Sequence, residues 1–107
     1  YIIYLIIKSD LNVAMKNINI DKIRKKLDKV DIELLKLIKK RSLFVDQVLS
    51  FKKSKKEIID QKRINFILKR IKKLSIKIKM DPKITINIWK VMIKGFINYE
   101  YTKFKKK

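Results

Sequence analysis

The scarcity of turn-forming residues is the feature that most limits what this chain can fold into. One glycine and one proline stand among its 107 residues, and there is no cysteine. Tight β-hairpins need glycine at positive φ, so sandwiches and barrels are not expected. Hydrophobic residues make up 47% of the chain, which is enough to build the core of one domain. Few and long elements are therefore expected, and the predicted fold class is all-α.

The same composition restricts the chemistry. The chain has no histidine and no cysteine. This removes the commonest general base, thiolate metal ligands and disulfide bonds. No metal site and no cofactor is expected, and any reaction must use Arg, Lys, Asp, Glu, Tyr or Ser.

The net charge of +20 has two interpretations. A basic chain can bind nucleic acid or an anionic membrane surface. However, all but four of the 30 basic residues are lysines, and Ile and Asn are also abundant, which is typical of an AT-rich genome. The charge is spread along the chain and is not gathered in one block. We favour compositional bias, so no nucleic-acid partner is expected.

The first residues form an apolar segment of unsettled role. Tyr1 to Ile7 are too few to span a bilayer and lack the basic start and small-residue cleavage site of a signal peptide. Residues 1–14 are interpreted as an N-terminal extension or the remnant of a targeting segment, and residues 15–107 as the domain. No membrane association is expected. A cytoplasmic location is predicted, with export if residues 1–14 are a signal remnant.

Helical periodicity predicts one long helix, from near Asn19 or Asp21 to about Lys53. Its apolar residues follow steps of three and four: Ile20, Ile23, Leu27, Val30, Leu34, Leu37, Ile38, Val45, Val48 and Leu49. Roughly 33 residues at 1.5 Å each give about 50 Å. This is long against the radius of gyration of about 13 Å expected for such a domain. A dimer is therefore predicted.

Two further helices are predicted after a loop at residues 54–59. Asp60 is suited to cap a helix at 60–74. Residues 75–80 alternate like a strand but are interpreted as a loop or a frayed helix end. Asp81-Pro82 places a cap and a proline at the start of a helix at 82–104.

Charged residues on apolar faces indicate where a site could lie. Arg41 and Lys52 are 11 residues apart, about 20° beyond three helical turns, so they share a face with Val45 and Val48. Two cations beside a packing face are costly unless an anion meets them.

On the third helix, Glu100 interrupts a stripe made of Ile93, Phe96, Ile97 and Phe104. It is either neutralised by a lysine or protonated, so that it donates a hydrogen bond to a ligand. Asp60 with Arg63 is either a site pair or a cap with a local ion pair.

Together these residues resemble the all-helical chorismate mutases over about residues 20–104. The opening helix is matched by Ile23-Arg24-Lys25-Lys26-Leu27-Asp28-Lys29-Val30-Asp31, Leu34-Leu35 and Lys40-Arg41, its end by Phe51-Lys52, and the later helices by Ile58, Asp60, Arg63 and Glu100. The resemblance implies a three-helix protomer with one long N-terminal helix, in an intertwined homodimer with shared active sites.

It also implies roles in binding chorismate, a dicarboxylate. Arg24 of the other subunit would bind one carboxylate and Arg41 the second. Lys52 would bridge a carboxylate and the ether oxygen, which Glu100 would also bind. Asp60 would hold the ring hydroxyl and Arg63 would support the carboxylate side.

Two departures favour a related activity. Ile64 stands where many mutases carry Glu, and Phe96 where some carry a small polar residue. Both changes, and the short loop after Lys52, resemble the isochorismate-pyruvate lyases. The mutase, which converts chorismate to prephenate, is the expected function. The lyase and a non-enzymatic, basic nucleic-acid-binding helical protein are the alternatives.

Overall fold

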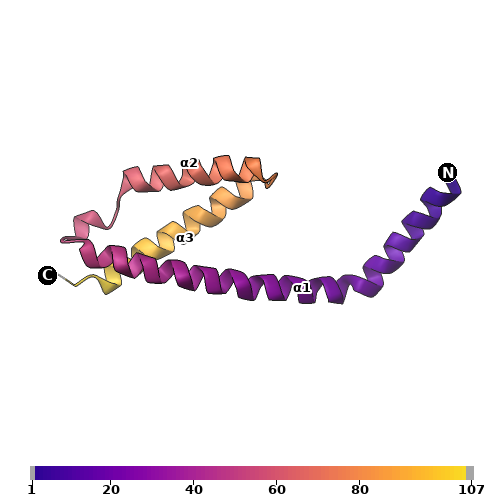
Figure 1. Cartoon of the computed structure of the whole chain (residues 1–107), viewed down its shortest axis with the longest axis horizontal. Coiled ribbons are helices and arrows are strands. Elements are labelled where there is room, and N and C mark those ends of the chain that lie inside the picture. The colour runs from indigo at the N-terminus through magenta and orange to yellow at the C-terminus, as the bar shows by residue number, and fades with distance from the viewer. Residues whose placement is uncertain (1, 106–107) are drawn as a thin grey trace. The chain divides into compact units, whose positions relative to one another are not determined.

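The computed structural model describes the backbone of residues 2–105 and the side chains of residues 19–105 (Figure 1). Three α-helices and one 3₁₀ helix follow one another: α1 (Ile2–Phe51), η1 (Lys55–Glu57), α2 (Gln61–Lys77) and α3 (Pro82–Lys103). Within these residues there is no β-strand. The all-α prediction with one long N-terminal helix is confirmed.

The predicted start of the first helix is wrong. Helical backbone begins at Ile2, well before Asn19 or Asp21. No glycine or proline lies between residues 2 and 51, so the sequence holds no residue that would break the helix there. The backbone of the proposed extension is thus part of α1, although its side chains lie outside the described ones. Its separation from the domain at residue 15 stays a prediction.

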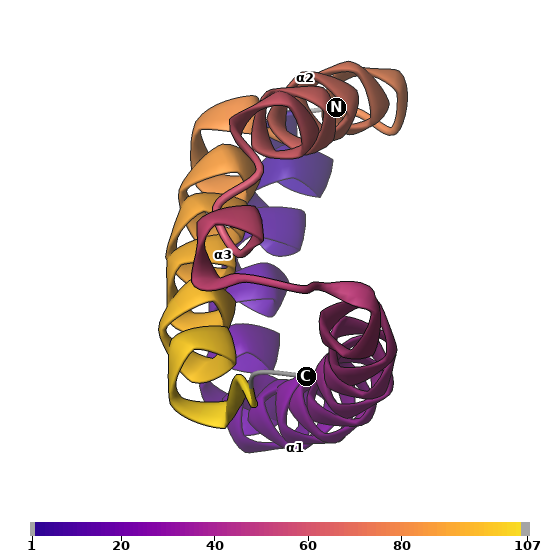
Figure 2. The same ribbon diagram turned by 90° about the vertical axis from the view of Figure 1, so that its left-hand side faces the viewer.

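The chain divides into two compact units, residues 1–40 and residues 41–107. The second unit contains the end of α1, the connection through η1, and the pair formed by α2 and α3. In this unit α3 contacts the C-terminal end of α1, and Figure 2 shows α2 farther from that end. Three apolar side chains from different parts of the unit are buried and form its small core: Leu49, Ile58 and Ile93.

The starts of α2 and α3 follow the predicted caps. The Asp60 carboxylate accepts a hydrogen bond from the Arg63 backbone N–H at 2.9 Å. The Asp81 carboxylate accepts one from the Lys83 backbone N–H at 2.9 Å, and Pro82 is the first helical residue. Each cap pairs a backbone donor that has no partner within its helix, which fixes where the helix begins.

Residues 75–80 were interpreted as a loop or a frayed helix end, and the structure shows the end of a helix, because α2 continues to Lys77, beyond the predicted end at residue 74. Ser75 is buried, and its hydroxyl donates to the Ile71 carbonyl at 2.6 Å. The same hydroxyl lies 2.7 Å from the Thr85 hydroxyl of α3. This contact between α2 and α3 stabilises the last turn of α2. The reversal follows at Lys79, whose φ of 61° is left-handed.

In the part of the chain that the structure describes, no helix combines the length and the apolar character needed to cross a bilayer.

Candidate active site

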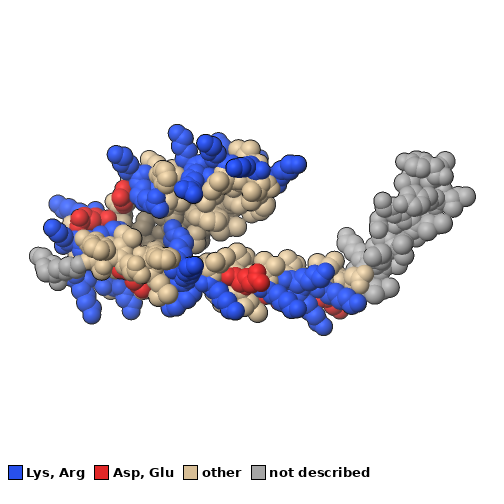
Figure 3. All heavy atoms as spheres, viewed as in Figure 1, with Lys and Arg blue, Asp and Glu red and all other residues tan. Residues whose placement is uncertain are grey.

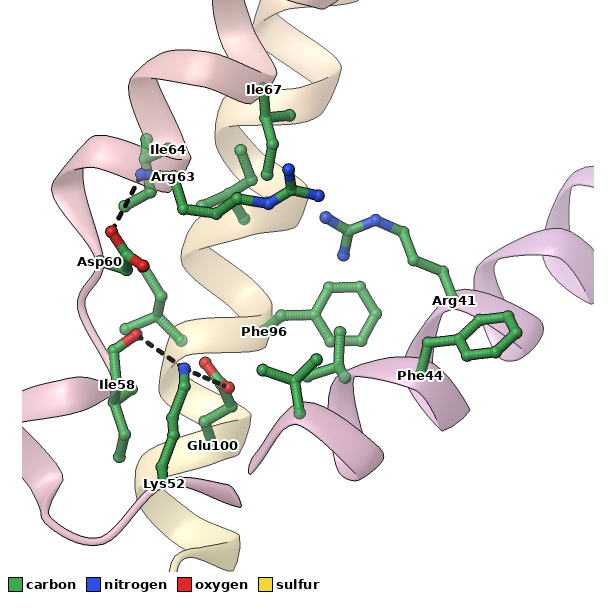
Figure 4. A pocket seen from close by; sticks show the side chains of 14 residues that line it. Arg41, Phe44, Lys52, Ile58, Asp60, Arg63, Ile64, Ile67, Phe96 and Glu100 are labelled. Atoms are coloured by element: carbon green, nitrogen blue, oxygen red, sulfur yellow. Dashed lines mark hydrogen bonds and ion pairs between the residues drawn. The ribbon is translucent and has the colours of Figure 1, made fainter. Parts of the chain in front are cut away.

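A pocket of about 240 Å³ opens in the second unit, between the end of α1, α2 and α3 (Figure 4). Five of the polar residues singled out in the sequence line it: Arg41, Lys52, Asp60, Arg63 and Glu100. The rest of the lining is apolar: Phe44, Val45, Val48, Ile58, Ile64, Ile67, Ile93, Phe96 and Ile97. Arg41 and Lys52 line the same pocket, as their spacing predicts, although α1 ends at Phe51 and Lys52 lies one residue beyond the helix.

Arg24 is the sixth predicted site residue. It is exposed on the part of α1 that belongs to the first unit. Its predicted role requires a second subunit, so it stays a prediction.

Lys52 and Glu100 form an ion pair inside the pocket. The Lys52 Nζ atom lies 3.0 Å from Glu100 Oε1 and donates a second hydrogen bond to the Ile58 carbonyl at 3.3 Å. Glu100 is buried, with 6% of its surface exposed. Of the two interpretations of Glu100, the structure therefore gives it a lysine partner. An ammonium has three N–H donors, so the third remains for a ligand.

The connection after α1 holds Lys52 and Asp60 at the same side of the pocket. The Glu57 carboxylate accepts hydrogen bonds from the backbone N–H of Ser54, at 2.9 Å, and of Lys53. These two hydrogen bonds lower the pKa of Glu57 below its usual value, and the one from Ser54 has the larger effect. Ile58, with 2% of its surface exposed, fixes the connection against the core.

Arg41 and Arg63 reach into the pocket from opposite sides. Figure 4 shows the guanidinium of Arg41, from α1, pointing toward that of Arg63, from α2. Burial lowers the pKa of Arg41, the positive charge of Arg63 lowers it further, and Glu100 raises it. Arg41 stays charged because a guanidinium does not lose its proton in proteins. Two facing cations are arranged to meet an anion.

Two polar residues beside the pocket escaped the sequence analysis. The Tyr99 hydroxyl donates to Asp46 Oδ1 at 2.7 Å, which ties α3 to α1. Tyr99 also packs edge-on against Phe96, with ring centroids 6.4 Å apart and an interplanar angle of 87°. Its spacing from Asp46, 53 residues, gave no local signal.

Basic side chains are not confined to this pocket. On the face drawn in Figure 3, Lys and Arg lie along both α1 and α2. Among the described residues, no three acidic, histidine or cysteine side chains group so as to hold a metal ion.

The pocket combines fixed cations, one buried carboxyl and an apolar wall. This arrangement defines an all-helical protein whose pocket has the cations and apolar walls suited to a small organic anion.

Comparison with known families agrees with this class. The family model of chorismate mutase type II matches residues 23–101. The chain therefore belongs to the chorismate mutase type II family, which confirms the resemblance drawn from the sequence. No curated protein and no solved structure matches the chain.

Proposed function

We propose that this protein is a chorismate mutase that works as an intertwined homodimer. One observation carries the proposal: Arg41, Lys52 and Arg63 converge with Asp60 and Glu100 on a single pocket whose other walls are apolar. The substrate, chorismate, carries two carboxylates on an apolar ring skeleton. Guanidinium groups bind carboxylates through paired hydrogen bonds, which fits them to this substrate.

The reaction needs no nucleophile, metal ion or net proton transfer. In one pericyclic step the ether C–O bond breaks and a new C–C bond forms. The protein must hold the substrate in its compact shape, which is catalysis by positioning. Arg41 would bind one carboxylate, Arg63 would support it, and Arg24 of the second subunit would bind the other. Asp60 would bind the ring hydroxyl.

Negative charge grows on the ether oxygen as the bond breaks. The third N–H of Lys52 is suited to meet that oxygen, since its other two donors are held by Glu100 and Ile58. A fixed donor of this kind typically accelerates a reaction by about a hundredfold or more. Glu100 can donate to the same oxygen only when protonated.

A related reaction is the second candidate. Ile64 and Phe96 both line the pocket, where many mutases carry Glu and some carry a small polar residue. Apolar residues at these two positions resemble the isochorismate-pyruvate lyases, which favours that reaction as the alternative. That reaction would release pyruvate and leave salicylate, and it would use the same cations to bind the substrate.

One assay separates the two. Purified protein is supplied with chorismate or isochorismate, and prephenate and salicylate are each measured. The mutase proposal predicts prephenate from chorismate, with little salicylate from isochorismate. The reverse pattern would replace the mutase with the lyase. Turnover of neither substrate, with binding to DNA that falls steeply with salt, would favour the nucleic-acid alternative.

A further inference from the structure

The position of the Arg41 guanidinium needs a physical cause. It faces the like charge of Arg63 and is partly removed from water. In the described part of the chain, Arg41 forms no ion pair, because the Glu100 carboxylate within the pocket is bonded to Lys52. Repulsion alone would turn the flexible side chain of Arg41 toward solvent.

Besides the charge of Glu100, the face of an aromatic ring attracts the Arg41 guanidinium. The Arg41 Cζ atom lies 5.1 Å from the centroid of the Phe96 ring. A guanidinium within about 6 Å of a ring centroid is attracted by the negative face of the ring, and more strongly where water is excluded. Phe96 stands on α3, one turn before Glu100. The Phe96 ring therefore contacts the Arg41 guanidinium within the same pocket that Glu100 lines (Figure 4).

The ring itself is held by a second layer of contacts. Tyr99 packs edge-on against Phe96, and its hydroxyl donates to Asp46. Asp46 lies on α1, five residues after Arg41. The chain of contacts from Arg41 through Phe96 and Tyr99 to Asp46 thus begins and ends on α1. It fixes the ring relative to the helix that carries the guanidinium.

We propose that Phe96 is a positioning residue that holds the Arg41 guanidinium in the pocket, ready for a substrate carboxylate. This inference rests on the proposed function, because it assigns the carboxylate to Arg41. A small polar side chain at residue 96 has no aromatic face and could not do this. A leucine has similar apolar bulk without the ring, so Phe96→Leu separates the attraction from simple space-filling.

Nuclear magnetic resonance reads the contact directly. The chain has four arginines, so the side-chain Nε–Hε region holds few signals, which conservative Arg→Lys substitutions assign. Ring currents of Phe96 should move the Arg41 Hε signal upfield of the Arg24 signal in the wild-type protein. Phe96→Leu should remove this displacement, and Phe96→Tyr should keep it.

The chain offers a matched control. Arg63 lies over the ring of Phe66, with its Cζ atom 5.2 Å from the centroid. Phe66→Leu should therefore move the Arg63 signal and leave the Arg41 signal displaced. An Arg41 signal without upfield displacement in the wild-type protein would overturn the inference, even if Phe96→Leu failed to fold.

Kinetics test the functional part. Phe96→Leu should raise KM for chorismate about tenfold, since the lost attraction is of the order that changes binding by this factor, with a smaller change in kcat. Phe96→Tyr should restore KM. An unchanged KM in Phe96→Leu, with the Arg41 signal moved, would overturn the positioning role. Absence of turnover in the wild-type protein would instead refute the proposed function, and the resonance result would still decide the contact.

Discussion

Two stretches of α1 differ in what their apolar side chains contact within the protomer. Between residues 41 and 52, Leu49 is buried, Val45 is half-buried and three apolar residues line the pocket. Between residues 20 and 38 the apolar stripe is exposed, at 36% to 61% of each residue's surface: Ile20, Ile23, Leu27, Val30, Leu34, Leu37 and Ile38. The first stretch has a use within its own unit. Among the side chains that the structure describes, none in the second stretch is buried, which is the strongest physical reason to propose a second copy of the chain.

The largest expected effect comes from breaking the exposed stripe. Leu27 and Leu34 lie about 20° apart around the helix, so they share one face. Replacing both with Asp should separate the dimer and abolish turnover, because each proposed site needs Arg24 of the other subunit. Light scattering after size-exclusion chromatography measures the mass.

Lys29 and Lys36 lie on the opposite face of the same helix and serve as the control. Replacing both with Asp should leave the dimer intact. If the leucine variant stayed a dimer with full activity, the contrast between the two stretches would carry no functional meaning.

The next effect belongs to the pocket stretch. Lys52→Ala should lower kcat by about a hundredfold or more, with the dimer preserved, because it removes the donor to the ether oxygen. Lys53→Ala is the matched control, since Lys53 is the exposed neighbour and the same charge is lost. Steady-state rates of prephenate formation test both. Near-wild-type turnover in Lys52→Ala would place the reacting atoms elsewhere.

Glu100→Gln and Glu100→Leu test the buried carboxyl. Glutamine keeps a polar side chain that can donate a hydrogen bond to the ether oxygen, whereas leucine offers no donor. Glu100→Leu should therefore lower kcat about a hundredfold more than Glu100→Gln, as steady-state rates of prephenate formation would show. Equal rates in the two variants would remove this side chain from the mechanism.

The smallest effect is on stability at alkaline pH. The hydrogen bond to Asp46 raises the pKa of Tyr99 above its usual value near 10, and burial and the charge of Asp46 act in the same direction. The contribution of this bond is complete below pH 10 and is lost as pH rises through the raised pKa. Urea midpoints from pH 8 to 11.5 should therefore fall more steeply for the wild-type protein than for Tyr99→Phe. Parallel curves would show that the bond does not form in solution.

The sequence predicted those helix boundaries that contacts between neighbouring residues determine. The starts of α2 and α3 were correct because Asp60 and Asp81 cap the nearest backbone donors. The start of α1 was wrong because apolar periodicity shows which face packs but not where the helix begins. The end of α2 was missed because Ser75 is held by Thr85, a partner on another helix.

The site residues show the same difference between local and long-range contacts. Arg41 and Lys52 were found because helical spacing places them on one face, and Glu100 because it interrupts an apolar stripe. Helical spacing could not show that Lys52 is its partner, since 48 residues separate them, and only the family resemblance placed the two side chains close together. Asp46 and Tyr99 were missed for the same reason, because neither is unusual within its own helix.

Subunit mixing tests the central claim, that cations from two copies complete one pocket, most directly. Arg24→Ala and Lys52→Ala proteins are each measured alone, then unfolded together, refolded and assayed with chorismate. Each mixed dimer would contain one site with both residues intact and one with neither. The account predicts two weakly active parents and recovery to about a quarter of wild-type activity at equal mixing, because half of the dimers are mixed and each has one working site. A mixture no more active than its parents, with mixed dimers present, would contradict it.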